Sequence, residues 1–108
     1  MEHIFEGIGE KMIIASLALF PTSEGVSVSR YVKEAIKVIE SSGLKSMTGG
    51  MNTTIESPDL ETLFKVIQTA HHKMVEMGAK RIHIDLNVDH RLDRDATIES
   101  KLTSIDKG

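Results

Sequence analysis

A stretch of alternating residues, Arg81–Asp89, constrains the fold of this chain more than any other segment. Ile82, Ile84, Leu86 and Val88 occupy every second position, and polar or charged residues occupy the positions between them. Strict alternation with β-branched residues on one side is typical of a half-buried strand. We therefore predict a strand over 81–89, with its apolar side on the core and its polar side toward something hydrophilic.

The segments before this strand predict the rest of one small domain. Residues 12–20 are apolar on both sides, as in a central strand covered on both faces. Ser27 or Ser29 is predicted to cap a first helix, and Ser57 a second helix with Pro58 at its first position. The expected helices cover 30–42, 58–77 and 97–105, and the other expected elements are short strands over 44–48 and 53–56.

Each of the first two helices carries an apolar stripe at helical spacing, which predicts its buried side. We expect Gly43 and Gly78 to end these helices, because glycine readily adopts the left-handed conformation found there. The predicted stripes are Val32, Ala35, Ile36 and Ile39 in the first helix, and Leu60, Leu63, Phe64, Ile67, His71 and Met74 in the second.

The element order predicts an α+β fold, a ferredoxin-like βαββαβ sandwich with a four-stranded antiparallel sheet. The first and third strands would lie in the middle of the sheet, both helices on one face, and a short helix at the C-terminus. We expect one domain over 12–108, preceded by a poorly ordered extension over 1–11. A long edge strand and an apolar helix-free face predict self-association.

The composition narrows the range of partners. The chain has 108 residues, a formal net charge of −3, 4% aromatic residues and no cysteine. This excludes disulfides and cysteine nucleophiles, and argues against nucleic acid as a partner. No apolar run approaches the length of a membrane span. We expect a cytoplasmic protein that binds a neutral or cationic small molecule.

The polar side of the strand over 81–89 presents His83, Asp85, Asn87 and Asp89. An enzyme could use His83 and Asp85 as acid–base groups or metal ligands, although side chains two apart on a strand are about 7 Å apart. Alternatively, this side is simply hydrated or faces a second subunit, or it forms a ligand site at a subunit boundary. No nucleophile–base–acid set is visible, so we predict a non-enzymatic protein without a metal.

His71 lies on the predicted apolar stripe of the second helix. A histidine in that setting is either a core residue with one satisfied nitrogen or a group that reaches a ligand. Both interpretations stay open.

Several short segments stand out along the chain: Phe20-Pro21, Gly25, Ser27, Ser29, Tyr31-Val32, Met51-Asn52-Thr53, Ile55-Glu56, Ala70-His71 and Asp89-His90-Arg91. In their order and spacing, these segments resemble the YkoF-like thiamine-binding protein family over about residues 12–107. Asn52 stands where that family usually has glycine, and His90 where it usually has an acidic residue.

The resemblance implies a ferredoxin-like fold, assembly into dimers and tetramers, and non-catalytic binding of thiamine or its hydroxymethylpyrimidine moiety. Carboxylates would offset the thiazolium charge, hydroxyls and an imidazole would bind the pyrimidine, and an aromatic ring would lie against the ligand. The candidate ligand-binding residues are Ser27, Ser29, Tyr31, Asn52, Thr53, Glu56, His71 and Asp85. A regulatory amino-acid-binding module of the ACT kind is the alternative with the same fold.

Overall fold

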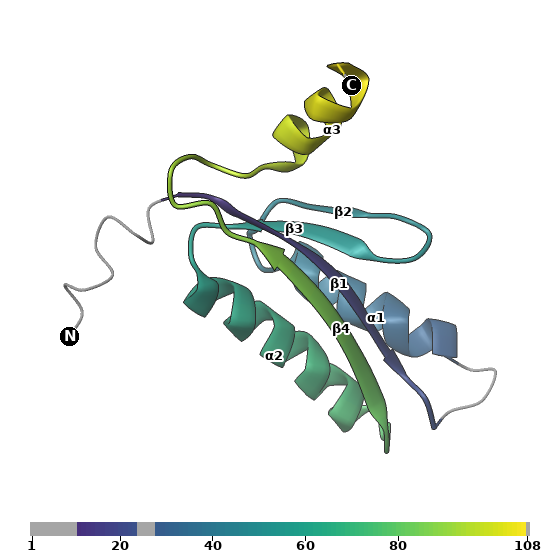
Figure 1. The fold of residues 1–108 in the computed structure, drawn as a ribbon. Helices are drawn as coiled ribbons and strands as arrows, with labels where there is room; N and C mark the ends of the chain where they lie inside the picture. Colours follow the sequence, from purple (N-terminus) through teal and green to yellow (C-terminus); the bar gives the residue numbers. More distant parts are fainter. Residues whose placement is uncertain (1–10, 24–27, 108) are drawn as a thin grey trace, which may run out of the picture.

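The computed structural model describes residues 11–23 and 28–107 and contains a four-stranded antiparallel sheet (Figure 1). The strand order is β2-β3-β1-β4, so the first and third strands are central and the other two lie at the edges, as predicted. Residues 1–10 of the predicted extension, and Ser27, lie outside the described residues. The strands are β1 (Ile13–Pro21), β2 (Ser46–Thr48), β3 (Thr53–Ser57) and β4 (Ile82–Asp89).

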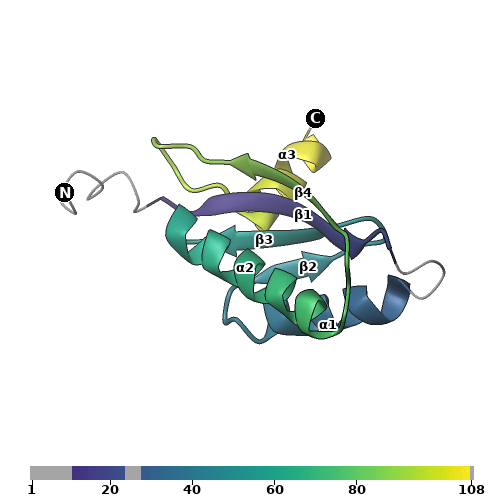
Figure 2. The same ribbon diagram turned by 90° about the horizontal axis from the view of Figure 1, so that it is seen from below.

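Within the described residues, three helices complete this small α+β fold: α1 (Val28–Glu40), α2 (Leu60–Glu76) and α3 (Ile98–Lys107). Figures 1 and 2 show α1 and α2 together on one face of the sheet, and α3 on the opposite side. Because α1 begins at Val28, Ser29 lies in its first turn, so the Ser29 alternative for the cap is wrong; the Ser27 alternative lies outside the described residues. No helix in the described ranges is long and apolar enough to cross a membrane.

The N-terminus of α2 corrects the predicted cap of the second helix. Asp59, not Ser57, is the cap: its extended backbone precedes the helix, and its Oδ1 accepts the backbone N–H of Thr62 at 2.6 Å. This contact holds the pKa of Asp59 below its usual value. A carboxylate is favoured here because the first turn of a helix carries partial positive charge. At the other end, Gly78 follows the helix with a φ of 97°, as predicted.

The main core lies between the sheet and the two helices on its face. Alternate residues of β1 point into it, and the strand register places Ala15 beside Ile55 and Leu17 beside Leu86 on the same side. Burying each large apolar side chain stabilises the fold by roughly 1.5–3 kcal/mol. The buried members are Ala15, Leu17, Leu19, Tyr31, Ala35, Ile39, Ile55, Leu63, Val66, Ile67, Ala70 and Met74.

The predicted buried stripe of α2 is correct only in part. Leu63, Ile67 and Met74 are buried, but Leu60 is 38% exposed and Phe64 is 50% exposed. The apolar side of β4 is likewise buried only in part. Ile82 and Leu86 pack against the core, whereas Ile84 and Val88 remain exposed. Figure 2 shows the reason: α1 and α2 lie beneath β1, β3 and β2, and β4 forms the outer rim of the sheet.

The opposite face of the sheet, here called the open face, is covered at one end. Ile14 packs there against Ala96 and Ile98, just before and at the start of α3. The rest of this face carries Phe20 and the polar side of β4. The ring of Phe20 lies against that of His83, with centroids 5.0 Å apart.

Candidate functional site

A cavity of about 230 Å³ lies between α1, β1 and the turn that joins β2 to β3. Its walls include residues 17–20 of β1, Val28, Val32 and Ile36 of α1, and residues 48–53 of the β2–β3 turn. All of these lie within one chain. One chain thus supplies these walls.

The cavity exists because the two neighbours of β1 pair with it over different lengths. β3 pairs with β1 only from Ile13 to Leu17, where Thr53 begins β3. β4, in contrast, continues its pairing to Pro21. Beyond Leu17, the β3 side of β1 has no strand partner within the described chain. Backbone N–H and C=O groups on that side of residues 18–20 can therefore bond to a ligand, because such groups require a partner when buried.

Two hydroxyl groups and an amide add polarity at the turn. Thr48 Oγ1 and Thr53 Oγ1 lie 3.2 Å apart, and Thr53 is buried. The side-chain amide of Asn52 donates a hydrogen bond to Ser16 Oγ on the open face. The backbone N–H of Gly49 donates to the Asn52 carbonyl at 2.8 Å. Together these bonds fix the turn that forms one wall of the cavity relative to β1.

The residues described around the cavity include no Asp, Glu, Lys, Arg or His. Its walls are mostly apolar, with hydroxyls and backbone groups as the polar components. Its volume lies below the range of about 300–1,000 Å³ usual for drug-sized ligands. The cavity is thus suited to one neutral ring with hydrogen-bonding edges, while any charged remainder of the ligand would extend toward solvent.

Among the predicted ligand-binding residues, Asn52 and Thr53 line this cavity. Tyr31 lies elsewhere, in the core, where it is 2% exposed. Its hydroxyl donates to the Met77 carbonyl at 3.4 Å, and the Arg30 guanidinium lies 4.5 Å from its ring centroid. Tyr31 therefore connects α1 to the end of α2.

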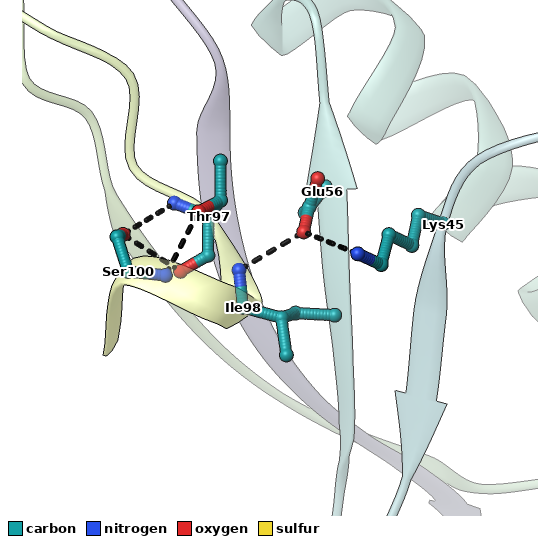
Figure 3. A network of polar contacts seen from close by, with 5 residues as sticks. All are labelled: Lys45, Glu56, Thr97, Ile98 and Ser100. Atoms are coloured by element: carbon teal, nitrogen blue, oxygen red, sulfur yellow. Dashed lines mark hydrogen bonds and ion pairs between the residues drawn. The ribbon is translucent and has the colours of Figure 1, made fainter. Parts of the chain in front are cut away.

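Glu56 is also buried, and it anchors α3 (Figure 3). Its Oε2 accepts the backbone N–H of Ile98 at 2.9 Å and lies 3.9 Å from Lys45 Nζ. Thr97 and Ser100 complete the helix start, because the backbone N–H of each donates to the other's hydroxyl at 3.0 Å. The Glu56 carboxylate thus holds α3 against the open face.

Replacing Glu56 with alanine should loosen α3 from the sheet. The Ile98 N–H would lose its buried acceptor, and such a loss costs about 1–3 kcal/mol. We expect faster amide hydrogen exchange over residues 96–102 and a lower free energy of unfolding in urea. Glu56→Gln keeps an acceptor oxygen and should have a smaller effect; equal protection of α3 in Glu56→Ala would contradict the anchoring role.

Ser29, His71 and Asp85 do not line the cavity, and Ser27 lies outside the described residues. Ser29 is exposed on α1, His71 is half-buried on α2, and Asp85 is exposed on the open face. Asp89 of the same face contacts Lys101, which holds the pKa of Asp89 below its usual value. In the described part of the chain, no group of three or more His, Asp or Glu side chains could hold a metal ion.

The sequence interpretation missed Val32, Ile36 and Thr48 as members of the site. Val32 and Ile36 belong to the apolar stripe of α1, and a stripe by itself predicts burial in a core rather than contact with a ligand. The available signal was the length of the expected strands, because residues 53–56 are too few to pair with all of a strand that ends near Pro21.

Comparison with known proteins assigns the chain to a family. A family model described as thiamine-binding protein matches residues 15–106. The chain therefore belongs to the thiamine-binding protein family.

Relatives in this family span nearly the full chain. A UPF0045 protein of Methanocaldococcus jannaschii is 36% identical over 95 residues, covering 88% of this chain and 93% of its own length. A UPF0045 protein of Bacillus subtilis is 36% identical over 101 residues, covering 89% of this chain and 96% of its own length.

Solved structures agree with this membership. The crystal structure of the M. jannaschii protein superposes with a TM-score of 0.81 at 35% identity, covering 91% of this chain and 99% of that one. A Thermotoga maritima protein, provisionally assigned to thiamine biosynthesis or salvage, gives a TM-score of 0.77 at 26% identity. The match covers 87% of this chain and 98% of that one.

Proposed function

We propose that this chain is a ferredoxin-like, non-enzymatic protein that binds thiamine through its hydroxymethylpyrimidine moiety and acts as a homo-oligomer. The observation that carries the proposal is a small cavity whose described walls carry no charged side chain, beside an edge of β1 that has no strand partner among the described residues. Membership of the thiamine-binding protein family and the likeness to the T. maritima protein support the same ligand class. The predicted cytoplasmic setting stays a prediction.

The chemistry of an aminopyrimidine fits this edge. Its exocyclic amine donates a hydrogen bond, and the adjacent ring nitrogen accepts one. A free strand edge offers backbone N–H and C=O groups in the same way that it would to another strand. The Thr48 and Thr53 hydroxyls can act as donor or acceptor at the same wall, and Val32 and Ile36 can cover the ring faces.

The positions of the charged residues favour one orientation of the bound ligand. Since the described cavity walls carry no carboxylate, they would give the cationic thiazolium no electrostatic stabilisation. We therefore place the pyrimidine in the cavity and the thiazolium toward solvent. In this arrangement hydroxymethylpyrimidine alone should retain most of the affinity of thiamine.

Titration calorimetry with hydroxymethylpyrimidine, thiamine and benzyl alcohol tests the proposal. We expect saturable binding of the first two, and weak binding of benzyl alcohol, which has no ring nitrogen or amine. Thr53→Val should weaken binding up to about tenfold, because one hydrogen bond contributes about 0.5–1.5 kcal/mol.

Thr54→Val is the matched control, since Thr54 points to the open face, next to Ser16. Heats equal to buffer blanks at millimolar ligand, or equal affinity for benzyl alcohol, would overturn the proposal. An amino-acid panel in the same assay tests the ACT-like alternative.

A further inference from the structure

A second hollow of the molecule lies between α1 and α2, along a different side of α1 from the cavity. Its volume is about 600 Å³, and Figure 2 shows the two helices side by side beneath the sheet. On α1 it is lined by Glu34, Lys37 and Val38, whereas Val32 and Ile36 line the cavity. We call this surface the α1–α2 groove.

The α1–α2 groove is lined by three lysines and one carboxylate. Lys37 belongs to α1, Lys65 and Lys73 belong to α2, and Glu34 is the one acidic residue among the described residues that line it. The whole chain, in contrast, carries a formal net charge of −3. The excess of positive charge in the groove is therefore local and opposite in sign to the charge of the molecule.

Ammonium groups of both helices act on the Glu34 carboxylate. Lys37 Nζ donates a hydrogen bond to Glu34 Oε2 at 3.0 Å and holds the pKa of Glu34 below its usual value. Lys73 and Lys33 lower this pKa further. Among the described residues, neither Lys65 nor Lys73 forms an ion pair. The groove therefore offers positive charge that the described chain leaves unbalanced.

The floor of the groove is apolar. Val38 of α1 is half-buried and Val66 of α2 is 9% exposed, and both line the groove beside the lysines. Thr62 and Thr69 add hydroxyl groups along the α2 side. An occupant that fits this surface combines negative charge with an apolar side.

The spacing of the lysines favours an extended occupant. Lys65 and Lys73 are eight residues apart in α2, or about 12 Å along the helix axis. A single phosphate group cannot lie at both ends of the groove, and it would leave Val38 and Val66 uncovered. Two carboxylates that are two turns apart on one side of a helix lie about 11 Å from each other, which matches the lysines.

We propose that the α1–α2 groove binds an acidic amphipathic helix of a partner protein, with carboxylates against the lysines and an apolar side chain on the two valines. A helix that lays its apolar side in a groove is a recurring mode of recognition. Exposed ion pairs contribute little individually, so the lysines would mainly determine orientation and the rate of association. The inference is separate from ligand binding, because the groove and the cavity use different sides of α1.

A model peptide tests this surface on the full chain. The probe is a fluorescein-labelled helical peptide of about 18 residues, or five turns, with leucines along one side and flanking glutamates. Its matched control has glutamine in place of every glutamate. We expect saturable binding of the glutamate peptide in fluorescence anisotropy, and about tenfold weaker binding of the glutamine peptide at low salt. The net charge of −3 predicts the opposite order, because it repels an acidic peptide.

Charge reversal locates the binding surface. Lys65→Glu and Lys73→Glu should each weaken binding of the glutamate peptide about fivefold to tenfold, because each replaces an attraction with a repulsion. Lys80→Glu is the matched control, since Lys80 is exposed beyond α2 and outside the groove. Equal losses in the three variants would show that only net charge matters, and would overturn the proposal.

Nuclear magnetic resonance of the native chain keeps the proposal falsifiable if a variant unfolds. The glutamate peptide should shift the backbone amide signals of residues 34–42 and 62–73. Shifts confined to other residues, or equal affinity for the two peptides, would overturn the proposal. Tighter binding of sodium tripolyphosphate than of the peptide at the same amides would also overturn it, in favour of a phosphate compound.

Sedimentation velocity of the chain without peptide excludes one further occupant. Native chain and Lys65→Glu should sediment alike if the groove receives a different protein. A change in sedimentation coefficient in Lys65→Glu, but not in Lys80→Glu, would make the groove a contact between copies and would overturn the proposal.

Discussion

Replacing Val32 with tryptophan is expected to abolish binding of hydroxymethylpyrimidine while the protein stays folded. Val32 is a partly buried residue of α1 that lines the cavity. An indole at this position would fill much of the 230 Å³ that we assign to the pyrimidine ring. We expect a loss of at least roughly 100-fold in affinity, or about 2.7 kcal/mol, measured by titration calorimetry.

The matched control is Val38→Trp on the same helix. Val38 faces the groove between α1 and α2, outside the cavity. Circular dichroism and urea unfolding should show both variants folded, since overpacking costs about 1–3 kcal/mol and less where an empty space accepts the new ring. A folded Val32→Trp protein that binds with native affinity would place the ligand somewhere other than this cavity.

Ile55→Ala should produce the largest loss of stability among the changes considered. Ile55 lies in the middle of β3, is 0% exposed and belongs to the core beneath the helices. Truncating a buried isoleucine to alanine costs about 2–5 kcal/mol, through lost transfer free energy and the cavity that remains. This is a large part of the roughly 5–15 kcal/mol by which a domain is usually stable.

Urea unfolding measures this change, with Thr54→Ala as the control. Thr54 is adjacent in β3 but points to the open face, so its truncation should change the free energy of unfolding by no more than about 0.5 kcal/mol. Equal effects for the two variants would mean that the assigned direction of β3 side chains is wrong.

Features that depend on neighbours in sequence were predictable from the sequence alone. The alternation in β4 determined which residues lie on each face, because successive side chains of a strand point to opposite sides. Gly78 marked the end of α2, since a left-handed residue is needed there. The order of strands and helices likewise limited the sheet to the observed arrangement, because connections between neighbouring elements are short and have a preferred hand.

Features that depend on the direction of packing were not predictable from the sequence alone. The apolar residues of α2 cover a wider arc than the core can bury, and the sequence cannot say which part faces inward. The structure buries Val66 and Ala70 and leaves Leu60 and Phe64 exposed, since α2 packs over the centre of the sheet. In the same way, the hydrogen bond from the Ile98 N–H to Glu56 joins residues far apart in the chain, so the sequence did not predict that Glu56 anchors α3.

The sequence by itself determined the elements, their order and the faces of each strand, because those properties are set by local periodicity and by residues at chain reversals. Only the tertiary structure decided where the cavity lies. It forms where β3 stops pairing at Leu17 while β4 continues to Pro21. That difference in length is a relation between three strands far apart in the chain, so no single segment of the sequence contains it.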